Sequence, residues 1–542
     1  MYISEMDVEN YRTFRKLHLR FDSRANYIVG ENNIGKSNLL SLLWTMTHGY
    51  GFMEKDFMDP DRPIRICMTL SAEDEGKDNQ AHVCFTQHVR EVMPRLTDED
   101  TGQQLPLEYL RCLFYIGFTL ENIPRKMLSE GKVQKLYEMF YRFLSARPDF
   151  REKAGTLLEK MGMPLTLSED PREAAACLLH EIYGDDSRGM SYDNTIKFMS
   201  AIGTLFLVKI LDKKKSKAIS FEDMIITDSK GKRYLPIIIS IDEPELHLHP
   251  YMQRAALAFF SAILNNEEPL FLEFIHTLLG IDGLDGQLFV VTHSTDALVN
   301  DYRQIIRMYW DETKMVQAAC GASFRFDREV EKHLIMHFPE VKEALYSRCT
   351  ILVEGETEYG SFGYFARTLG IHFDSYGICL INARGESSIK KIAQLIRRFH
   401  IPTVGLYDRD VAEEHPASPY VFYTDYICYE MDVVKACLAN RNREVLDRVI
   451  AETDSVSDAI NSSLIKKAGA KLGLPKGFYP PMKLKNIRSR NEKALEFYYF
   501  AWLYGNKGVI VGRALGEQLS AGEIPPAFER VIRAAVKYSD SR

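Results

Sequence analysis

The chain has 542 residues, a length that exceeds a single hydrophobic core and indicates at least two domains. Hydrophobic residues make up 46% and charged residues 26%, as in soluble globular proteins. No apolar run approaches the roughly 20 residues that span a bilayer, and the N-terminus shows no secretory signal, so we expect no membrane association. The nine cysteines occur singly, without a CxxC pair, which favours reduced thiols in a cytoplasmic protein.

The net charge of −7 means that a nucleic-acid partner would need a local basic surface, because the global field repels phosphate. One basic run exists, over residues 466–493, with a single acid, Glu492, and the aromatic residues Phe478 and Tyr479. Its basic members are Lys466, Lys467, Lys471, Lys476, Lys483, Lys485, Arg488, Arg490 and Lys493. Two interpretations stay open: a solvated surface loop, or a phosphate-binding groove with aromatic stacking sites.

The hydrophobic pattern predicts secondary structure along most of the chain. Strands are expected over residues 2–8, 17–21, 26–29, 64–70, 235–241 and 287–292, with an apolar helix from Lys36. The stretch from 88 to 199 is interpreted as a mainly helical insertion, with its clearest helices at 133–144 and 174–183. A βαβαβ alternation over residues 349–407 predicts a small parallel α/β domain. The predicted domains are therefore residues 1–340 and 341–542.

A phosphate-binding loop follows the third strand. Residues 30–37 read Gly-Glu-Asn-Asn-Ile-Gly-Lys-Ser, which matches GxxxxGK[ST] directly after an apolar strand and directly before a helix. The backbone N–H groups of such a loop hold phosphate at a helix N-terminus, where the helix dipole favours anions. In this arrangement Lys36 reaches the β- and γ-phosphates and Ser37 binds Mg²⁺. The sequence therefore predicts a site for ATP with Mg²⁺.

Two later strand ends carry further groups that an ATP site needs. The apolar run 236–241 ends in Asp242, which can hold Mg²⁺, and Glu243, which can polarise the attacking water. Alone, this pair also fits an exposed acidic turn. His293 follows the apolar run 288–292 and is a candidate sensor of the γ-phosphate, although a lone histidine is more often structural.

Residues 30–37, 242–250 and 291–294 resemble the Walker A, Walker B with D-loop, and H-loop motifs of ABC ATPases, in particular the SMC- and RecF-type ATPases that act on nucleic acid. Residues 10–14 resemble the N-terminal signature of that subgroup. The resemblance implies a nucleotide sandwiched between two heads, hence a homodimer or a larger even oligomer. It implies the nucleotide-binding residues Arg12, Gly30, Asn33, Gly35, Lys36, Ser37, Asn38 and Asp242.

Two parts of the chain depart from that pattern. The signature that should reach across the dimer is degenerate, with residues 186–191 as the best candidate, and no Q-loop glutamine can be assigned. Turnover could therefore be slow, or ATP could act as a structural or sensing ligand.

Acidic residues follow two strands of the C-terminal half. Residues 349–353 lead to Glu354, and Glu358 lies on the same face of a helix that would begin there; residues 402–407 lead to Asp408 and Asp410. The carboxyl ends of parallel strands meet at one edge of a sheet, so these carboxylates should converge. Their repulsion calls for a cation, and all-oxygen ligands suit Mg²⁺ or Mn²⁺, which can support phosphodiester cleavage. The alternative is that the acids only cap helices or occupy turns.

These residues resemble the Toprim domain, and an ATPase followed by Toprim resembles the OLD (overcoming lysogenization defect) family of ATP-dependent nucleases, which includes the nuclease subunit of the Gabija anti-phage system. The resemblance covers nearly the whole chain and is weakest over residues 88–199. It implies an α/β fold: an ABC-type ATPase head with a helical insertion, then a Rossmann-like Toprim domain with a basic C-terminal segment. The implied metal ligands are Glu354, Glu358, Asp408, Asp410 and Glu430, with Asp432 as a weaker candidate.

Two further positions come from the same resemblance. Gly385 falls at the turn after the second Toprim strand. Lys507 occupies the place of a late lysine that would neutralise charge developing at the scissile phosphate, with a solvated loop lysine as the alternative.

The leading hypothesis is an ATP-regulated, Mg²⁺-dependent endonuclease that cuts DNA in anti-phage defence, the defence role resting on family analogy. Its catalytic residues would be Glu243, His293, Glu354, Asp408, Asp410 and Lys507. Cleavage of RNA such as tRNA is one alternative, and an ATP-dependent nucleic-acid-binding scaffold that seldom cuts is another; a topoisomerase or primase role is more distant. Relatives occur alone, with a helicase-like subunit, or with a retron reverse transcriptase and its DNA, and the sequence does not separate these partners.

Overall fold

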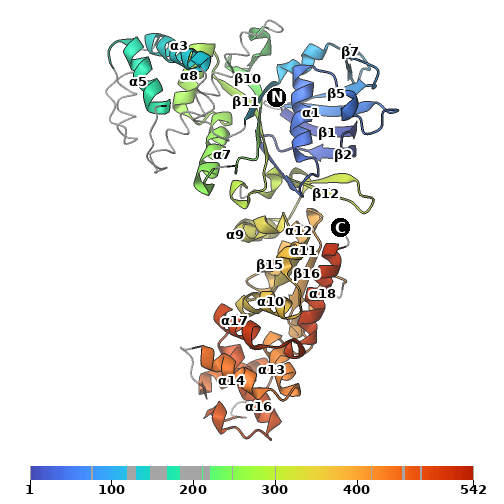
Figure 1. Cartoon of the computed structure of the whole chain (residues 1–542), viewed down its shortest axis with the longest axis vertical. Coiled ribbons are helices and arrows are strands. Elements are labelled where there is room, and N and C mark those ends of the chain that lie inside the picture. The colour runs from blue at the N-terminus through green and yellow to red at the C-terminus, as the bar shows by residue number, and fades with distance from the viewer. Residues whose placement is uncertain are drawn as a thin grey trace. The chain divides into compact units, whose positions relative to one another are not determined.

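The computed structural model of the chain describes residues 2–74, 77–118, 130–146, 168–183, 210, 220–246, 248–298, 301–416, 418–453, 458–475 and 479–540. The chain divides into two compact units, Met1–Phe324 and Arg325–Arg542 (Figure 1). No helix within the described ranges is long and apolar enough to cross a membrane. The predicted ATPase signature at residues 186–191 lies outside them.

The first unit contains two sheets. One is antiparallel, with the strand order β2-β1-β4-β5-β6-β7, and the other is mostly parallel, with the order β13-β12-β3-β11-β10-β8 and the short β9 beside β10. The strands are β1 (Tyr2–Tyr11), β2 (Phe14–Arg20), β3 (Ala25–Gly30), β4 (Ile64–Asp74), β5 (Lys77–Gln87), β6 (Arg95–Asp98), β7 (Gln104–Leu105), β8 (Phe114–Phe118), β9 (Ile226–Thr227), β10 (Arg233–Asp242), β11 (Gly283–Val291), β12 (Ile305–Trp310) and β13 (Val316–Cys320). The main helices are α1 (Lys36–His48), α3 (Glu130–Ala146), α5 (Pro171–Tyr183), α7 (Pro250–Leu264) and α8 (Pro269–Leu279).

Helix α1 packs against both sheets. It buries Leu39, Leu42 and Leu43 in one core with Val8 of β1 and Phe289 of β11. The loop before α1 is therefore fixed between two rigid layers, as the close position of α1 and β1 in Figure 1 illustrates.

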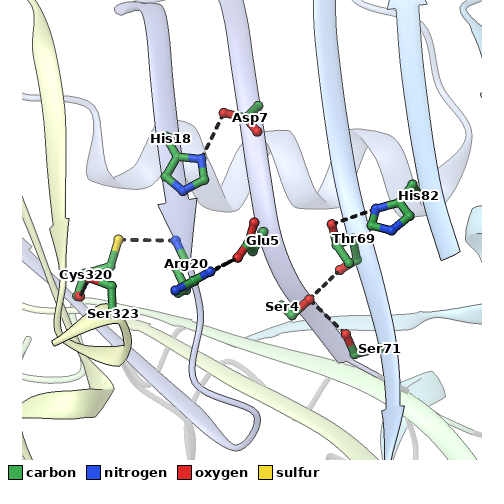
Figure 2. Close-up of polar contacts among 10 residues, drawn as sticks. All are labelled: Ser4, Glu5, Asp7, His18, Arg20, Thr69, Ser71, His82, Cys320 and Ser323. Atoms are coloured by element: carbon green, nitrogen blue, oxygen red, sulfur yellow. Dashed lines mark hydrogen bonds and ion pairs between the residues drawn. The ribbon is translucent and has the colours of Figure 1, made fainter. Parts of the chain in front are cut away.

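The exposed side of β1 carries charged pairs, which Figure 2 shows. Glu5 lies opposite Arg20, and Asp7 lies opposite His18, in the antiparallel register of β1 with β2. Arg20 Nε donates to Glu5 Oε1 at 2.8 Å, and His18 Nδ1 is 2.9 Å from Asp7 Oδ1. Met6 between these pairs and Val8 after them are fully buried, so the strand shows the period-two alternation of a sheet with one solvated face.

The expectation of a mainly helical segment from residue 88 is wrong as far as residue 118. β6 and β7 extend the antiparallel sheet, and β8 pairs in parallel with β10, with Ile116 opposite Ile239. A short apolar run such as β8 cannot be distinguished from a buried helical turn by periodicity alone, which explains the error. Further along, α3 and α5 confirm the two helices predicted at 133–144 and 174–183.

The expectation of reduced thiols is wrong for one pair. Cys67 and Cys84 form a disulfide, and they are direct partners in the register of β4 with β5, with their Cα atoms 4.1 Å apart. Strand pairing creates this proximity, which isolated cysteines in a sequence do not reveal. The free cysteines among the described residues are Cys177, Cys320, Cys349, Cys379, Cys428 and Cys437.

The second unit is built on a parallel four-stranded sheet with the order β15-β14-β16-β17. Its strands are β14 (Cys349–Val353), β15 (Ile378–Asn382), β16 (Thr403–Tyr407) and β17 (Val421–Tyr423). Its main helices are α9 (Arg328–Ala344), α10 (Glu356–Thr368), α12 (Glu386–Arg398), α13 (Tyr429–Ala439), α14 (Arg443–Glu452), α15 (Ser462–Lys471), α16 (Glu492–Gly505), α17 (Val509–Gln518) and α18 (Pro526–Asp540). The βαβαβ alternation predicted for residues 349–407 is confirmed, and with it the α/β fold class.

Helices cover this sheet and continue beyond it. Both α12 and α18 contact β14 and β16, and every residue of β14 is buried, as expected for a covered parallel strand. Helices α13, α14, α16 and α17 share one core, whose largest fully buried side chains include Trp502, Tyr498 and Tyr499. This core fixes the starts of α13 and α17, both of which bear on the site described below.

Candidate functional sites

The phosphate loop between β3 and α1 requires glycine at two positions. Gly30 and Gly35 have φ values of 147° and 110°, and a Cβ on Gly35 would lie 2.4 Å from Thr13 Oγ1. Lys36 is buried, and its Nζ donates to the carbonyl oxygens of Gly30 at 3.1 Å and Glu31 at 2.8 Å. No side chain caps the start of α1, so its first backbone N–H groups are left for an anion. This is the local geometry of a phosphate site.

The two residues predicted to hold Mg²⁺ beside ATP are in contact. Ser37 Oγ donates to Asp242 Oδ1 at 3.2 Å, although they lie 205 residues apart in the sequence. Burial raises the pKa of Asp242, while the hydrogen bond from Ser37 opposes that rise. Burial also lowers the pKa of Lys36, which Glu243 and Asp242 partly offset. The residues of the predicted ATP site therefore share one electrostatic environment.

Glu243 and His293 also lie together. His293 Nε2 is 3.8 Å from Glu243 Oε1, and burial lowers the pKa of His293, with Lys36 acting in the same direction. Glu245 fixes this arrangement, because it accepts hydrogen bonds from the His293 backbone N–H at 2.5 Å and from Thr292 Oγ1 at 2.8 Å. Sequence reasoning gave Glu245 no role, since its partners lie on a distant strand.

Arg12 and Asn38 support the loop from the side of β1. Arg12 donates through Nη1 to Asn38 Oδ1 at 3.0 Å and through Nε to Asp56 Oδ1 at 2.8 Å. Asn38 Nδ2 donates to Thr13 Oγ1 at 3.3 Å, and Asn33 within the loop has a φ of 61°. These contacts brace the loop, and direct binding of nucleotide by Arg12, Asn33 and Asn38 stays a prediction.

In the second unit, Glu354 and Asp408 follow neighbouring strands. β14 and β16 pair in parallel with Leu352 opposite Gly405, so the two strands end at the same edge of the sheet. The carboxylates interact electrostatically, since Glu354 contributes to the raised pKa of Asp408. The two strand ends therefore lie side by side.

Two helix starts bring further acids to these strand ends. Glu358 lies in the first turn of α10. Its carboxylate lies close to Gly355, the residue after Glu354, because a Cβ added to Gly355 would be 3.0 Å from Glu358 Oε2. Glu430 lies in the first turn of α13, and the N–H of the preceding Tyr429 donates to Asp408 Oδ1 at 3.1 Å. Glu358, Asp408 and Glu430 are each at most 7% exposed. We call Glu354, Glu358, Asp408, Asp410 and Glu430 the carboxylate cluster.

Burial and repulsion act on the acids of this cluster. Burial raises the pKa of Asp408 to about 7, with further contributions from Glu430 and Glu354. The pKa of Glu358 is raised by burial and then by Glu430, and that of Glu354 is raised by burial against the opposing effect of Lys507. Groups in this state ionise readily only when a cation compensates them.

Two lysines enter the cluster. Lys507 Nζ lies 2.9 Å from Glu430 Oε1, an ion pair without good hydrogen-bond alignment, because neither buried oxygen of Glu430 has a hydrogen-bond partner among the described residues. Lys471 Nζ lies 2.5 Å from Asp410 Oδ2 and 3.8 Å from Asp408 Oδ2. Lys507 lies in the loop between α16 and α17 and its side chain is 43% exposed, so its role stays a prediction, whereas the side chain of Lys471 is only 17% exposed.

The cluster fits a divalent cation in charge and in ligand type. Its five carboxyl groups meet two lysines, so negative charge is left uncompensated when the acids ionise. Buried Glu430 oxygens without hydrogen-bond partners are suited to ligate a hard cation. If Asp410 and Glu430 ligated a cation, they would have to give up their ion pairs with Lys471 and Lys507.

The cluster is not the tightest potential ligand set in the described part of the chain. Two sets of three groups lie within 4.8 Å: Cys67, Cys84 and Glu99, whose two cysteines form the disulfide and so offer no thiolate, and a second set of Glu386, Glu414 and His415. In the second set, His415 forms an ion pair with Glu386 and stacks on Tyr407 at 4.3 Å. Sequence reasoning missed this set because its members come from separate segments.

Most of the basic run lies on the surface, but its aromatic part does not. The exposed members are Lys466, Lys467, Lys483, Lys485, Arg488, Arg490 and Lys493. Tyr479 stacks on Phe497 with ring centroids 4.2 Å apart, so it belongs to the core and does not provide the predicted stacking site. Lys476 and Phe478 lie outside the described residues.

Two other predicted positions have structural roles. Gly385 has a φ of 135°, and its N–H donates to the Glu354 carbonyl oxygen at 2.8 Å, which ties the turn after β15 to the end of β14. Asp432 accepts hydrogen bonds from the N–H groups of Asp425 at 2.8 Å and Tyr426 at 2.6 Å. Asp432 therefore closes a turn and is not arranged as a metal ligand.

Both units match known protein families. Residues 345–410 match the family model of the overcoming lysogenization defect protein-like TOPRIM domain, and residues 1–162 match that of an AAA ATPase domain. The uncharacterized protein YbjD of Escherichia coli K12 is 27% identical over 179 residues, which are 32% of this chain and 28% of YbjD. The chain thus matches less than a third of the length of this relative.

Two solved structures resemble parts of the chain. The SMC head domain from Thermotoga maritima has 13% identity and a TM-score of 0.31, covering 59% of this chain and 98% of that one. The C-terminal region of the Xanthomonas campestris OLD protein has 17% identity and a TM-score of 0.24, covering 36% of this chain and 96% of that one.

Proposed function

We propose that this chain, in which an ATPase domain is fused to an OLD-like Toprim domain, is an ATP-regulated nuclease that cuts nucleic acid with a divalent cation. The observation that carries the proposal is the carboxylate cluster, in which Glu354 and Asp408 end adjacent strands while Glu358 and Glu430 join them from two helix starts. Buried acids concentrated at the ends of parallel strands destabilise a fold unless they serve a ligand.

The cluster would hold Mg²⁺ or Mn²⁺ through Glu354, Glu358, Asp408, Asp410 and Glu430. Such ions activate a water and stabilise the leaving oxygen when they are bound. Lys507, which is paired with Glu430, would supply positive charge to balance the negative charge that develops on the phosphoryl oxygens during cleavage. The exposed part of the basic run would follow the phosphate backbone, a contact that weakens as salt rises. DNA is the favoured substrate.

The ATPase domain would regulate cutting. Lys36, Ser37 and Asp242 would hold ATP with its Mg²⁺, and Glu243 would polarise the attacking water. Glu245 accepts a hydrogen bond from the His293 backbone N–H, directly after β11. Loss of the γ-phosphate on hydrolysis would therefore change the position of His293 and of the end of β11. We further propose that two heads dimerise over ATP, in a homodimer or a larger even oligomer in the cytoplasm.

A role in anti-phage defence extends this proposal by analogy with the OLD family. The partner would be a helicase-like subunit or a retron reverse transcriptase with its DNA, or the nuclease would act alone. Plating of phage on cells that carry the gene with its neighbours tests this extension.

Parallel incubation with supercoiled plasmid and with total tRNA tests the central proposal. We expect the wild-type protein with Mg²⁺ to nick or linearise plasmid, and Asp408→Ala and Glu354→Ala to lose this activity while binding ATP normally. Cleavage of tRNA alone would assign the same centre to RNA. Equal cutting by wild type and Asp408→Ala would overturn the proposal. A scaffold would be indicated if both variants protected cells from phage as wild type does while Lys36→Ala did not.

A further inference from the structure

Lys471 has a position that distinguishes it from every other described lysine of the basic run. It is the last residue of α15, its side chain is only 17% exposed, and its ammonium group pairs with Asp410 and lies near Asp408. Its neighbours Lys466 and Lys467 on the same helix are exposed. The Lys471 side chain therefore contacts the carboxylate cluster and does not belong to the exposed basic surface.

Tyr504 connects Lys471 to Lys507. The Nζ atom of Lys507 lies 4.6 Å from the centroid of the Tyr504 ring, and that of Lys471 lies 5.9 Å from the same centroid. The ring stacks on fully buried Phe500, with centroids 5.3 Å apart, so it is itself held in place. Cation–π attraction to one fixed ring sets the position of both ammonium groups.

Gly505 lies where the end of α16 packs against α15. A Cβ on Gly505, at the end of α16, would lie 2.1 Å from Leu464 Cδ2 of α15. A side chain at this position would require the flexible end of the Leu464 side chain to move. The lysine pair is thus built by the packing of α15 on α16.

We propose that Lys471 and Lys507 act as a pair on the scissile phosphate, with Tyr504 as the positioning residue; this inference rests on the proposed nuclease function. Lys471 pairs with Asp410 and Lys507 pairs with Glu430, so the two ammonium groups lie at separate places in the cluster. A phosphodiester presents two non-bridging oxygens, and lysine binds phosphate as a point charge. When cations occupy the carboxylates, both ammonium groups are released toward the phosphate oxygens.

The test compares Lys471→Ala and Lys471→Met with Lys435→Met. Lys435 is a matched control, because it also forms one ion pair, at 2.6 Å to Glu496, and one ring contact, at 5.2 Å to Tyr426, but lies outside the cluster. Plasmid cleavage at saturating Mg²⁺ gives kcat and KM, Mn²⁺ titration followed by electron paramagnetic resonance gives the metal affinity, and thermal unfolding checks folding.

Both Lys471 variants should lower kcat by roughly 10²-fold or more, the loss typical of removing one group that stabilises a transition state, with Mn²⁺ affinity and Tm little changed. Lys435→Met should keep kcat. Tyr504→Leu should lower kcat in the same direction, and Tyr504→Phe should retain it, because the phenylalanine ring still attracts cations.

Wild-type kcat in both Lys471 variants together with tighter Mn²⁺ binding would overturn the inference, since Lys471 would then only neutralise the acids. That outcome leaves the nuclease proposal standing as long as Asp408→Ala is inactive. Cutting by Asp408→Ala would instead refute the nuclease proposal itself.

Discussion

Gly512 of α17 packs directly on the backbone of Thr357 in α10, so closely that a Cβ on Gly512 would lie 2.2 Å from the Thr357 carbonyl oxygen. A second contact reinforces it, because the Gly508 N–H donates to Thr357 Oγ1 at 3.0 Å. Glu358 lies in the first turn of α10, and α17 begins just after Lys507. This contact therefore sets the distance between the Glu358 carboxylate and the Lys507 ammonium group.

Gly512→Ala should therefore destabilise the second unit by about 1–3 kcal/mol, as overpacking of a close contact does. Differential scanning calorimetry or urea unfolding measures the change. Gly363→Ala is the matched control on α10, because a Cβ there meets no atom within 4 Å. It should be neutral or stabilise by up to about 1 kcal/mol. Equal effects of the two substitutions would show that the close contact does not hold α17 in place.

Gln287 ties the two sheets of the first unit together. Its fully buried amide accepts from Ile3 N–H at 2.9 Å and donates to the carbonyl oxygens of Ile3 at 2.9 Å and Asp22 at 2.8 Å. Gln287→Leu strands these backbone groups, at a cost of about 1–3 kcal/mol for each buried group left unpaired. Urea unfolding should show this loss, whereas Gln103→Leu at an exposed turn should change stability by less than about 0.5 kcal/mol.

Two substitutions in the predicted ATP site should distinguish ATP binding from ATP hydrolysis. Lys36→Ala should abolish ATP binding, because Lys36 supplies the buried charge of the phosphate loop. Glu243→Gln should bind ATP normally but hydrolyse it about 10²–10⁴-fold more slowly, the usual contribution of a general base. Fluorescent-nucleotide binding and phosphate release measure the two steps, with Lys232→Ala, which is exposed and lies at the opposite end of β10 from Asp242, as the control. Normal ATP binding by Lys36→Ala would contradict the assignment of the loop.

A bound cation should raise the Tm of the second unit, and the buried carboxylate charge should lower it. In a chelator, Asp408→Asn should raise the Tm, because it removes one of several buried, mutually repelling carboxylates. Mg²⁺ should raise the Tm of the wild type by ligand linkage and leave Asp408→Asn nearly unchanged. Asp374→Asn, an exposed site, should behave as wild type in both conditions. A Tm of Asp408→Asn below that of wild type in chelator would show that the carboxylate stabilises the fold instead of straining it.

Local sequence patterns predicted the parts of the sites that local geometry creates. The phosphate loop follows from residues 30–37 alone, because strand, loop and helix are consecutive. The meeting of Glu354 and Asp408 follows from two apolar runs that end in acids, once both strands are taken as parallel. Glu358 and Glu430 reach the same place because each lies in the first turn of a helix.

Contacts between distant segments were beyond prediction. Lys471 pairs with Asp410, which lies 61 residues away in the sequence. The sequence alone does not distinguish Lys471 from its exposed neighbours, because the packing of α15 on α16 creates the difference. Tyr479 looked available for stacking, yet it is used by the core. β8 was read as helix because its partner β10 begins more than a hundred residues later, and the pairing of Cys67 with Cys84 depends on strand register.

Anomalous diffraction from crystals grown with Mn²⁺ tests the central claim most directly. The account predicts a peak ligated by carboxylates of the cluster, Glu354 and Asp408 among them, with Lys471 or Lys507 displaced from its acid. A cluster without a peak, while Mn²⁺ occupies Glu386, Glu414 and His415, would contradict a metal-dependent nuclease centre at these strand ends.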